Sequence, residues 1–557
     1  MRLRATEAVY NRSILSSSNQ VEKKLLLKTR GCSLMTKIVN PVLPGYHPDP
    51  SILRVEDDYY IAVSTFEWFP GVQIYHSKDM VNWQLLPYPL TRASQLDMIG
   101  NPNSGGVWAP CLSYSDGLFY LIYTDVKSRM GAFKDTHNYL VTAENIEGPW
   151  SEPIYLNSSG FDPSLFHDDD GKKWLVNMIW DFRKGTNSFA GIALQEYSVE
   201  EKKLVGPIRN IFKGSELGLT EAPHLYKRNG YYYLLTAEGG TWYTHAATMA
   251  RSESLFGPYE IDPTNPILTS DQSDLTQLQK SGHGSLVETQ NGEWYMAHLC
   301  GRPVVDKKCI LGRETAIQKM YWTEDGWIRV EGGNHPQWEV DAPDLPAHPV
   351  EHESNYDDFK ETSYKKYWNS LRRPFGEDWI SLTDRPGYLT LKGGESMSSM
   401  HRQSLVARRL ESFHTEIETE IEFNPDTFQQ MAGLIVYYDT DDHVYLRVTH
   451  HEEVGTCLGI IETKHGKYDE LLASDVSLSE GSSCKLKATI ENQWLQFAYS
   501  LDGETWNQIG DKIDISHLSD DDADYIRFTG TFVGVCAQDL SGQAKPSYFK
   551  YFDYKEL

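Results

Sequence analysis

Three acidic side chains occupy similar positions in separate parts of the chain. Asp49 lies in HPDPS, Asp162 in FDPS and Glu221 in TEAPH, in each case one or two residues before a proline. Two carboxyl groups can cleave a glycosidic bond when one protonates the leaving oxygen and the other assists water or attacks the sugar. These residues therefore favour acid–base chemistry on a sugar, provided that the fold brings the three segments together.

Each of these residues also has a simpler interpretation. An Asp before Pro at the start of a strand often caps its own backbone, and Glu221 could be a solvated loop residue. His283 in GHGS is typical of a structural histidine, and Trp108 and Phe161 are typical of core residues. A catalytic role is favoured over a structural one only if the fold brings these residues to equivalent positions.

Five segments supply such equivalent positions, because they share one pattern. Each has a short apolar stretch, a polar turn and an aromatic-rich apolar run, which is typical of a β-hairpin. The segments are PDPSILRVEDDYYIAVS (48–64), WAPCLSYSDGLFYLIYT (108–124), FDPSLFHDDDGKKWLVNMI (161–179), EAPHLYKRNGYYYLLTA (221–237) and GHGSLVETQNGEWYMAHL (282–299). Aligned on Pro50, Pro110, Pro163, Pro223 and Gly284, they are 60, 53, 60 and 61 residues apart.

An all-β repeat of this length predicts a propeller with one four-stranded sheet per blade, and hence five blades. A solenoid or a sandwich is the alternative. In a propeller the first strand of each blade lies nearest the axis. The position before the aligned residue holds Asp49, Ala109, Asp162, Ala222 and His283, and the position before that holds Pro48, Trp108, Phe161, Glu221 and Gly282.

Three carboxyl groups, one histidine and two aromatic rings are therefore expected to converge on one cavity. Ionised groups that share a partly dry site are costly unless their proximity is used, so this constellation is the candidate site. Phe66 in TFEWFPGVQIY and Trp180 in NMIWD add aromatic rings beside it. Aromatic faces can pack against the apolar side of a sugar ring.

The repeat ends near residue 345, and the Pro-rich segment 341–354 is typical of a linker. We assign residues 35–345 to the propeller. Residues 346–557 contain many short alternating or apolar runs, such as TEIETEIEF (415–423) and AGLIVYY (432–438), without intervening helices. This pattern predicts a β-sandwich, so the fold class is all-β.

Composition excludes several classes of protein. A formal charge of −26 argues against a nucleic-acid partner, which needs clustered Lys and Arg, and no segment approaches the roughly 18 apolar residues of a membrane span. Seven scattered cysteines without CxxC spacing favour a reducing, cytoplasmic location. Residues 1–34 lack a signal-peptide core, so we expect a disordered tail or an upstream-start artefact, with a transit peptide as the alternative.

The sequence resembles glycoside hydrolase family 43, and in particular its two-domain β-xylosidases. The motifs that carry the resemblance are NPVLPGYHPDPSI, STFEWFPGV, NSGGVWAP, NSSGFDPSLFHDDDG, LTEAPHLYK, TAEGGT, LGRETAIQ and FTGTFVGV. The resemblance covers nearly everything from Met35 to Leu557. It implies a five-bladed propeller followed by a β-sandwich, and inversion at the anomeric carbon.

The resemblance also assigns roles to the carboxyl groups. It implies that Asp49 is the general base, that Glu221 is the general acid, and that Asp162 orients the acid and raises its pKa. A neighbouring negative charge favours the protonated form of a carboxylic acid, which agrees with this division. In an inverting enzyme the two working carboxyl groups stand roughly 6.5–9.5 Å apart.

Further residues match the substrate pocket of the family. Arg313 in LGRETAIQ resembles an active-site arginine, and Phe66, Trp108 and Phe161 resemble walls of the terminal-sugar subsite, with Trp180 beside them. Phe532 in FTGTFVGV resembles a residue of the second domain that closes this pocket. The resemblance thus implies an exo-acting enzyme that releases D-xylose from the non-reducing ends of short β-1,4-xylo-oligosaccharides.

His283 matches a histidine at the propeller axis. In some members of the family it helps to hold a divalent cation such as Ca²⁺ through water, whereas others work without metal. We therefore expect no required cofactor, and treat a cation near His283 as an open alternative. Similar enzymes are often dimers or tetramers, so a homo-oligomer is expected.

Three other functions remain open at this point. The nearest is an α-L-arabinofuranosidase, or both activities in one pocket, because xylopyranose and arabinofuranose can present similar hydroxyl groups. A retaining enzyme of a related five-bladed family would use the same carboxyl groups differently. A propeller that only binds carbohydrate is the remaining alternative, but a mere binding site gains little from three convergent carboxyl groups.

Overall fold

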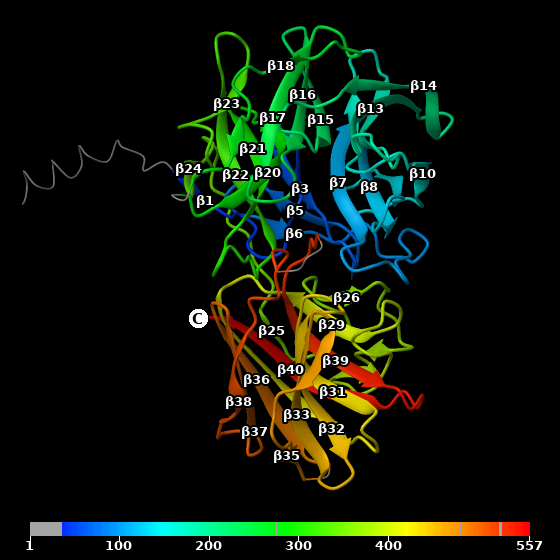
Figure 1. Cartoon of the computed structure of the whole chain (residues 1–557), viewed down its shortest axis with the longest axis vertical. Helices are drawn as coiled ribbons and strands as arrows, with labels where there is room; N and C mark the ends of the chain where they lie inside the picture. The colour runs from blue at the N-terminus through cyan, green and yellow to red at the C-terminus, as the bar shows by residue number, and fades with distance from the viewer. Residues whose placement is uncertain (1–35, 274–275, 480, 523–525) are drawn as a thin grey trace, which may run out of the picture.

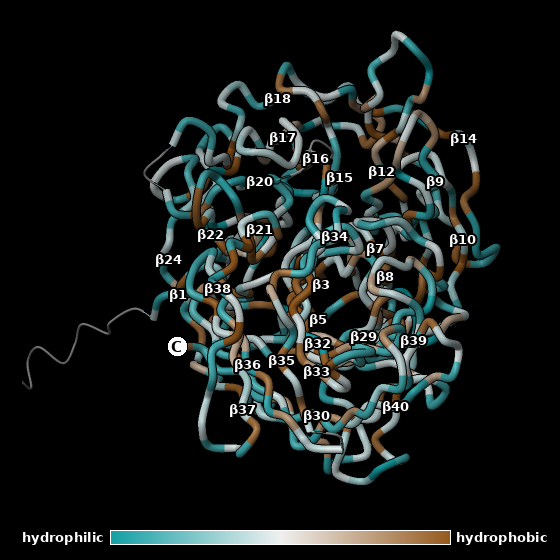
Figure 2. Tube along the Cα trace, turned by 60° about the horizontal axis from the view of Figure 1, so that its bottom comes forward, coloured by the Kyte–Doolittle hydropathy of each residue, from teal (hydrophilic) through white to brown (hydrophobic). Residues whose placement is uncertain are grey.

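The computed structural model describes residues 36–273, 276–479, 481–522 and 526–557, and they form two all-β domains (Figure 1). The predictions for residues 1–34 therefore lie outside the described residues. No helix in the described part of the chain is long and apolar enough to cross a membrane. Hydrophobic residues follow the strands, whereas many outer loops are hydrophilic (Figure 2).

The first domain is a five-bladed propeller, as predicted, with each blade an antiparallel sheet. The first three blades consist of β2 (Ser51–Val55), β3 (Asp58–Val63), β5 (Gln73–Ser77) and β6 (Gln84–Leu85); β7 (Gly106–Ser115), β8 (Leu118–Ser128), β9 (Asp135–Ala143) and β10 (Ile154–Asn157); and β11 (Ser164–His167), β12 (Lys173–Trp180), β13 (Phe189–Ser198) and β14 (Lys203–Phe212). Each predicted hairpin supplies the two inner strands of its blade.

The fourth blade has a fifth, short strand, and a separate strand pair joins the two ends of the domain. The strands are β15 (Glu221–Arg228), β16 (Tyr231–Glu238), β17 (Ala246–Ser252), β18 (Glu260–Ile261) and β19 (Leu268–Thr269); β20 (Gln279–Glu288), β21 (Trp294–Gly301), β22 (Arg313–Trp322) and β23 (Ile328–Val330); and β1 (Lys37–Val39) with β24 (Glu339–Asp341). After β1 the chain runs beside β22 before it enters the first blade. There the amides of Leu43 and His47 donate to the carbonyls of Thr315 and Arg313.

Polar contacts between inner strands hold the blades around the axis. One such contact crosses each of the five blade boundaries: Leu112 N to Ser51 Oγ (3.1 Å), His167 Nε2 to Ser113 Oγ (2.9 Å), Ser164 Oγ to Pro223 O (2.5 Å), Leu286 N to Tyr226 Oη (2.8 Å) and Ile52 N to Ser285 Oγ (3.1 Å). The ring of inner strands is therefore joined directly as well as through apolar packing.

The second domain is a sandwich of two antiparallel sheets, as predicted. One sheet runs β27 (Ile380–Ser381), β28 (Leu389–Lys392), β40 (Pro546–Glu556), β30 (His414–Glu422), β36 (Ser483–Glu491), β37 (Trp494–Ser500) and β38 (Asn507–Asp514), with β25 (Tyr356–Asp357) beside β40. The other runs β34 (Lys467–Glu470), β33 (Gly455–Lys464), β32 (His443–His451), β31 (Gln430–Tyr437), β39 (Phe532–Asp539), β29 (Ser404–Arg409), β26 (Asn369–Leu371) and β4 (Trp68–Phe69), with β35 (Val476–Ser477) beside β33.

Strand β4 belongs to the propeller in sequence but to the sandwich in structure. It lies in the loop between β3 and β5, and Trp68 and Phe69 pair with Leu371 and Ser370 of β26. The Trp68 ring stacks on Phe532 of β39, with centroids 3.8 Å apart and planes at 14°. The pairing of β4 with the sheet of the sandwich and a buried ring pair therefore join the two domains. The predicted linker lies between β24 and β25, and the division at residues 345/346 stays a prediction.

This junction predicts that the domains stabilise each other. We expect Trp68→Ala to lower the free energy of unfolding by about 3–5 kcal/mol, the usual cost of truncating a large buried aromatic residue. Trp68 is fully buried and its Nε1 has no hydrogen-bond partner among the described residues, so the loss is one of packing. Urea denaturation followed by circular dichroism measures it. Trp494→Ala, at a position 41% exposed, is the control and should change stability by about 0.5 kcal/mol or less.

Candidate active site

The predicted residues, with the exception of Phe532, meet in one pocket at the propeller axis. The cavity has a volume of about 410 Å³, which is typical of small-ligand sites. All five blades and the sandwich contribute to its walls. It is lined by Asp49, Phe66, Trp108, Arg129, Met130, Gly131, Lys134, Phe161, Asp162, Trp180, Phe189, Leu219, Glu221, Gly240, Thr241, Trp242, His283, Arg313, Ile526 and Phe528.

The backbone adopts the same unusual conformation at the innermost position of every blade. Asp49, Ala109, Asp162, Ala222 and His283 all have positive φ, between 38° and 57°. This region is sterically costly for residues other than glycine, and such strain is commonly stored at functional sites. Three of the blades also shift register here, between β7 and β8, β15 and β16, and β20 and β21. The column that the repeat alignment defined is thus a structural column.

Asp49 is held by groups from three blades. Arg313 Nη1 donates to its Oδ1 at 3.0 Å, and Ser64 Oγ donates to its Oδ2 at 2.7 Å. Ser64 Oγ in turn accepts the amide of Ala109 at 2.8 Å, which fixes the hydroxyl. A buried guanidinium and a fixed hydroxyl donor both favour the ionised form of a carboxyl group.

Asp162 and Glu221 lie beside Asp49 without a direct ion pair among the described residues. Burial, followed by the charge of Asp49, raises the pKa of Asp162 to about 8, although the Ala222 amide donates to its Oδ2 at 3.1 Å. Burial, followed by the charges of Asp162 and Asp49, raises the pKa of Glu221 well above its usual range. The site therefore pairs one arginine-bound carboxyl group, that of Asp49, with two buried carboxyl groups whose pKa values are raised.

The residues around His283 indicate whether a metal ion could be bound there. Its Nδ1 lies 3.5 Å from Asp49 Oδ1, the same oxygen that accepts from Arg313, and burial lowers the pKa of its imidazole. A cation placed directly on Asp49 would face the charge of that guanidinium. No group of three or more His, Cys, Asp or Glu in the described chain is arranged to hold a metal ion. These residues offer no ligand set, so we assign no step of the reaction to a cation.

The predicted aromatic walls line the pocket together. Trp108 lies between Phe66 (ring centroids 5.8 Å apart) and Phe161 (5.4 Å), and Trp180 lies beyond Phe161 at 6.5 Å. The ammonium of Lys134 stands 4.4 Å from the centre of the Trp180 ring. The aromatic surface thus continues from the carboxyl groups outward.

The prediction for Phe532 is wrong. This residue is fully buried and stacks on Trp68 at the domain junction, and it does not line the pocket. The sandwich reaches the pocket through Ile526 and Phe528 instead. The Phe528 carbonyl accepts from Arg313 Nη2 at 3.2 Å, and its ring lies 5.3 Å from Trp108. The physical reason is that Phe532 is the first residue of β39, where its side chain faces the buried contact between the two domains.

Sequence reasoning also missed Ser64 and the outer wall of the pocket. Ser64 opens the STFEWFPGV motif, so a search for donors next to that aromatic cluster could have found it. The motif TAEGGT contains Gly240 and Thr241, which line the pocket. Arg129 and Lys134 lie in a loop after β8 that has no repeat counterpart, and no sequence signal indicated them.

Comparisons with known proteins agree with this geometry. The model of glycosyl hydrolases family 43 matches residues 38–328, and that of the beta xylosidase C-terminal concanavalin A-like domain matches residues 356–555. The structure resembles the crystal structure of a xylan beta-1,4-xylosidase from Bacillus halodurans C-125, with a TM-score of 0.92, 65% identity, and coverage of 93% of this chain and 100% of that one.

Two curated proteins are similar over nearly their full length. A beta-xylosidase of Bacillus subtilis (strain 168) is 53% identical over 93% of this chain and 100% of its own. A xylosidase/arabinosidase 43B of Humicola insolens is 50% identical over 94% of this chain and 98% of its own. The protein is therefore a glycoside hydrolase. It belongs to glycosyl hydrolases family 43.

The raised pKa of Asp162 predicts how stability depends on pH. An ordinary Asp in the unfolded chain titrates near 3.8, whereas Asp162 in the folded protein has a pKa of about 8. Between these values the folded state holds a proton that the unfolded state has lost, so stability falls as pH rises. Asp162→Asn cannot titrate and can still accept from the Ala222 amide. We expect its melting temperature to exceed that of the wild type by a margin that grows from pH 5 to pH 8, reaching a few degrees.

Thermal unfolding at several pH values measures this margin. Asp57→Asn, at an exposed position, is the control and should show a margin that does not change with pH. A margin for Asp162→Asn that also stays constant would contradict the raised pKa.

Proposed function

We propose that the enzyme is an exo-acting, inverting β-xylosidase that releases D-xylose from the non-reducing ends of short β-1,4-xylo-oligosaccharides. The observation that carries this proposal is the arrangement of charge: Arg313 holds one carboxylate, Asp49, beside two buried carboxyl groups with raised pKa values. An inverting glycosidase needs one ionised and one protonated carboxyl group at the same sugar.

The proposed reaction is a single displacement. Asp49 accepts a proton from water as the water oxygen attacks the anomeric carbon, and the bond from that carbon to the leaving oxygen breaks. Glu221 gives its proton to the leaving oxygen, so the leaving sugar departs neutral. Asp162 orients the acid, because the Ala222 amide that follows Glu221 in the chain donates to the Asp162 carboxyl. In the state in which Asp162 is ionised, its charge also raises the pKa of Glu221. After each turnover Asp49 must lose a proton and Glu221 must regain one.

The remaining walls support a neutral sugar in the pocket. Phe66, Trp108 and Phe161 present aromatic surface to the space beside the carboxyl groups. Phe528 of the sandwich adds its ring next to Trp108. A wall from a second domain limits the length of chain that can enter, which supports release of one terminal sugar. Small xylo-oligosaccharides are thus the proposed partners.

An α-L-arabinofuranosidase, or an enzyme with both activities, is the second candidate. A relative at 50% identity is named a xylosidase/arabinosidase, which is the observation that favours it. Comparing kcat/KM on p-nitrophenyl β-D-xyloside and α-L-arabinofuranoside separates the two candidates. A much higher value on the arabinoside would make the arabinofuranosidase the main activity.

We also propose a cytoplasmic location and a homo-oligomeric state. The six cysteines in the described chain are buried and free, which supports a reducing compartment: Cys111, Cys300, Cys309, Cys457, Cys484 and Cys536. Fractionation of the source cells and light scattering of the purified enzyme test these two proposals. A water-mediated cation near His283 also stays a prediction, which activity after treatment with a chelator would test.

Proton NMR of xylobiose hydrolysis tests substrate and stereochemistry together. We expect α-xylose as the first product released from the non-reducing end, because water attacks the face opposite the leaving group. Mutarotation then forms the β-anomer on a slower timescale. Early β-xylose in excess of the share that the reducing end of xylobiose already contributes would mean retention and would overturn the role of Asp49 as a base that activates water.

Variants of the two working carboxyl groups should differ in their dependence on the leaving group. We expect Asp49→Ala to lower kcat on both xylobiose and p-nitrophenyl β-D-xyloside by roughly 10²–10⁴-fold, since water activation is needed for either substrate. Glu221→Ala should lower kcat by a similar factor on xylobiose but by much less on the nitrophenyl substrate, whose leaving oxygen needs no proton. Steady-state kinetics with both substrates measures this, and equal losses in Glu221→Ala would contradict its role as the acid.

A further inference from the structure

The segment of the sandwich that reaches the pocket has an anchor of its own. Residues 526–531 precede β39, and Figure 1 shows this orange-red part of the chain rising from the sandwich toward the propeller. Ile526 and Phe528 line the pocket, whereas Arg527 between them is fully buried. The side chain of Arg527 points away from the pocket, because its guanidinium binds Asp442 of the sandwich.

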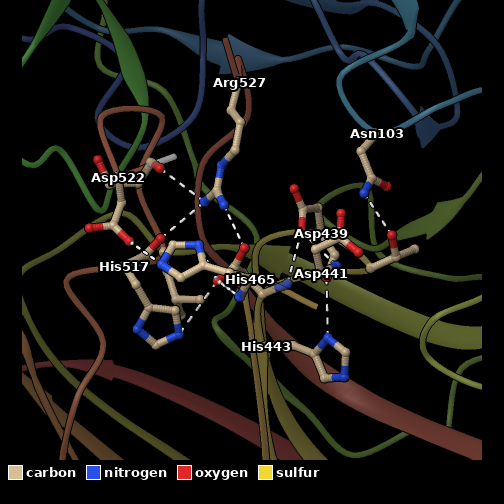
Figure 3. A network of polar contacts seen from close by, with 12 residues as sticks. Asn103, Asp439, Asp441, His443, His465, His517, Asp522 and Arg527 are labelled. Atoms are coloured by element: carbon tan, nitrogen blue, oxygen red, sulfur yellow. Dashed lines mark hydrogen bonds and ion pairs between the residues drawn. The ribbon is translucent and has the colours of Figure 1, made fainter. Parts of the chain in front are cut away.

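Arg527 is bound on the sandwich side by a fork of hydrogen bonds. Nη1 donates to Asp442 Oδ2 at 2.5 Å, and Nη2 donates to the carbonyls of His517 and Ser519 at 3.0 and 2.9 Å. Figure 3 shows the guanidinium directed toward His465, His517 and the turn that contains Asp439 and Asp441. The fork therefore joins two separate parts of the sandwich, the turn with Asp442 and the segment with His517 and Ser519, to one residue.

Asp442 is itself held in a rigid turn between β31 and β32. Its side chain is fully buried, and its Oδ1 accepts the amide of His465 at 3.0 Å. Asp439 Oδ1 accepts the amides of Asp441 and Asp442 at 2.8 and 3.0 Å. The propeller contacts the same turn, because Asn103 Nδ2 donates to Thr440 Oγ1 at 2.6 Å (Figure 3).

On the propeller side the segment is bound through its main chain. Arg129 Nη1 donates to the Ile526 carbonyl at 2.7 Å, and the Phe528 amide donates to Ser104 Oγ at 3.1 Å. Arg313 donates to both the Phe528 carbonyl and Asp49, so it joins the segment to the proposed base. Three hydrogen bonds to its main chain therefore hold the segment on the propeller.

We propose that the buried Arg527–Asp442 pair is a positioning device that holds Ile526 and Phe528 against the sugar and so sets substrate affinity. A buried ion pair is in general weak evidence for stability, because desolvation of both charges offsets their attraction. A role in fixing one conformation explains its place behind the pocket wall. This inference rests on the proposed function of the pocket as the sugar site.

The test removes both charges of the pair together, so that neither stays buried without the other. Arg527→Met/Asp442→Asn is compared with Arg329→Met/Asp262→Asn, which removes a doubly bonded ion pair of the propeller whose members do not line the pocket. We expect the first double variant to raise KM for xylobiose about tenfold while kcat changes less than threefold, and the control to keep KM within twofold. Arg527→Lys, which keeps the charge but not the fork, should lie between the wild type and the double variant.

Hydrogen exchange of the Phe528 amide gives a readout that does not depend on hydrolysis. We expect faster exchange of the peptide 526–531 in the Arg527 double variant than in the wild type, and no change there in the control. Unchanged KM and unchanged exchange, in a variant with a native circular dichroism spectrum, would overturn the positioning role. A wild type that does not hydrolyse xylobiose would overturn the proposed function instead, and the exchange result would still decide the inference about position.

Discussion

The charge balance at the propeller axis determines the rest of the site. One guanidinium, that of Arg313, faces three buried carboxyl groups. Of these three, Asp49 is the one with which it forms a hydrogen bond. Because burial and mutual repulsion penalise further negative charge, Asp162 and Glu221 have raised pKa values. A carboxyl group bound by arginine and two carboxyl groups with raised pKa values thus lie in one pocket, which agrees with the division of roles proposed for acid–base cleavage of a glycoside.

The propeller makes this arrangement possible because five blades bring equivalent positions together at one axis. The positive φ shared by Asp49, Ala109, Asp162, Ala222 and His283 represents backbone strain of about 1–3 kcal/mol at each position. Contacts across all five blade boundaries and the apolar cores between the sheets offset that strain. Members of the column are also in contact with each other, since the Ala222 amide donates to Asp162 and His283 Nδ1 lies 3.5 Å from Asp49 Oδ1.

The fold and the inner half of the site could be predicted from the sequence because both follow the internal repeat. The 53–61-residue period indicated the blades, and the column beside the aligned prolines indicated Asp49, Asp162 and His283. The outer half of the pocket could not be predicted in the same way. Arg129 and Lys134 come from a loop outside the repeat, and strand β4 leaves its blade to pair with β26. Local pattern contains no information on such long-range pairing.

The error at Phe532 shows what a motif can and cannot decide. FTGTFVGV contains two aromatic residues within five positions, and resemblance alone chose the one that stacks on Trp68. Phe528 reaches the pocket because Arg527 before it turns inward to Asp442. The chain thus assigns one aromatic residue to join the domains and another to the substrate. The three carboxyl groups proposed for catalysis come from the propeller, whereas part of the wall proposed to limit the substrate comes from the sandwich. Arg313 joins the two, because it donates to both Asp49 and the Phe528 carbonyl.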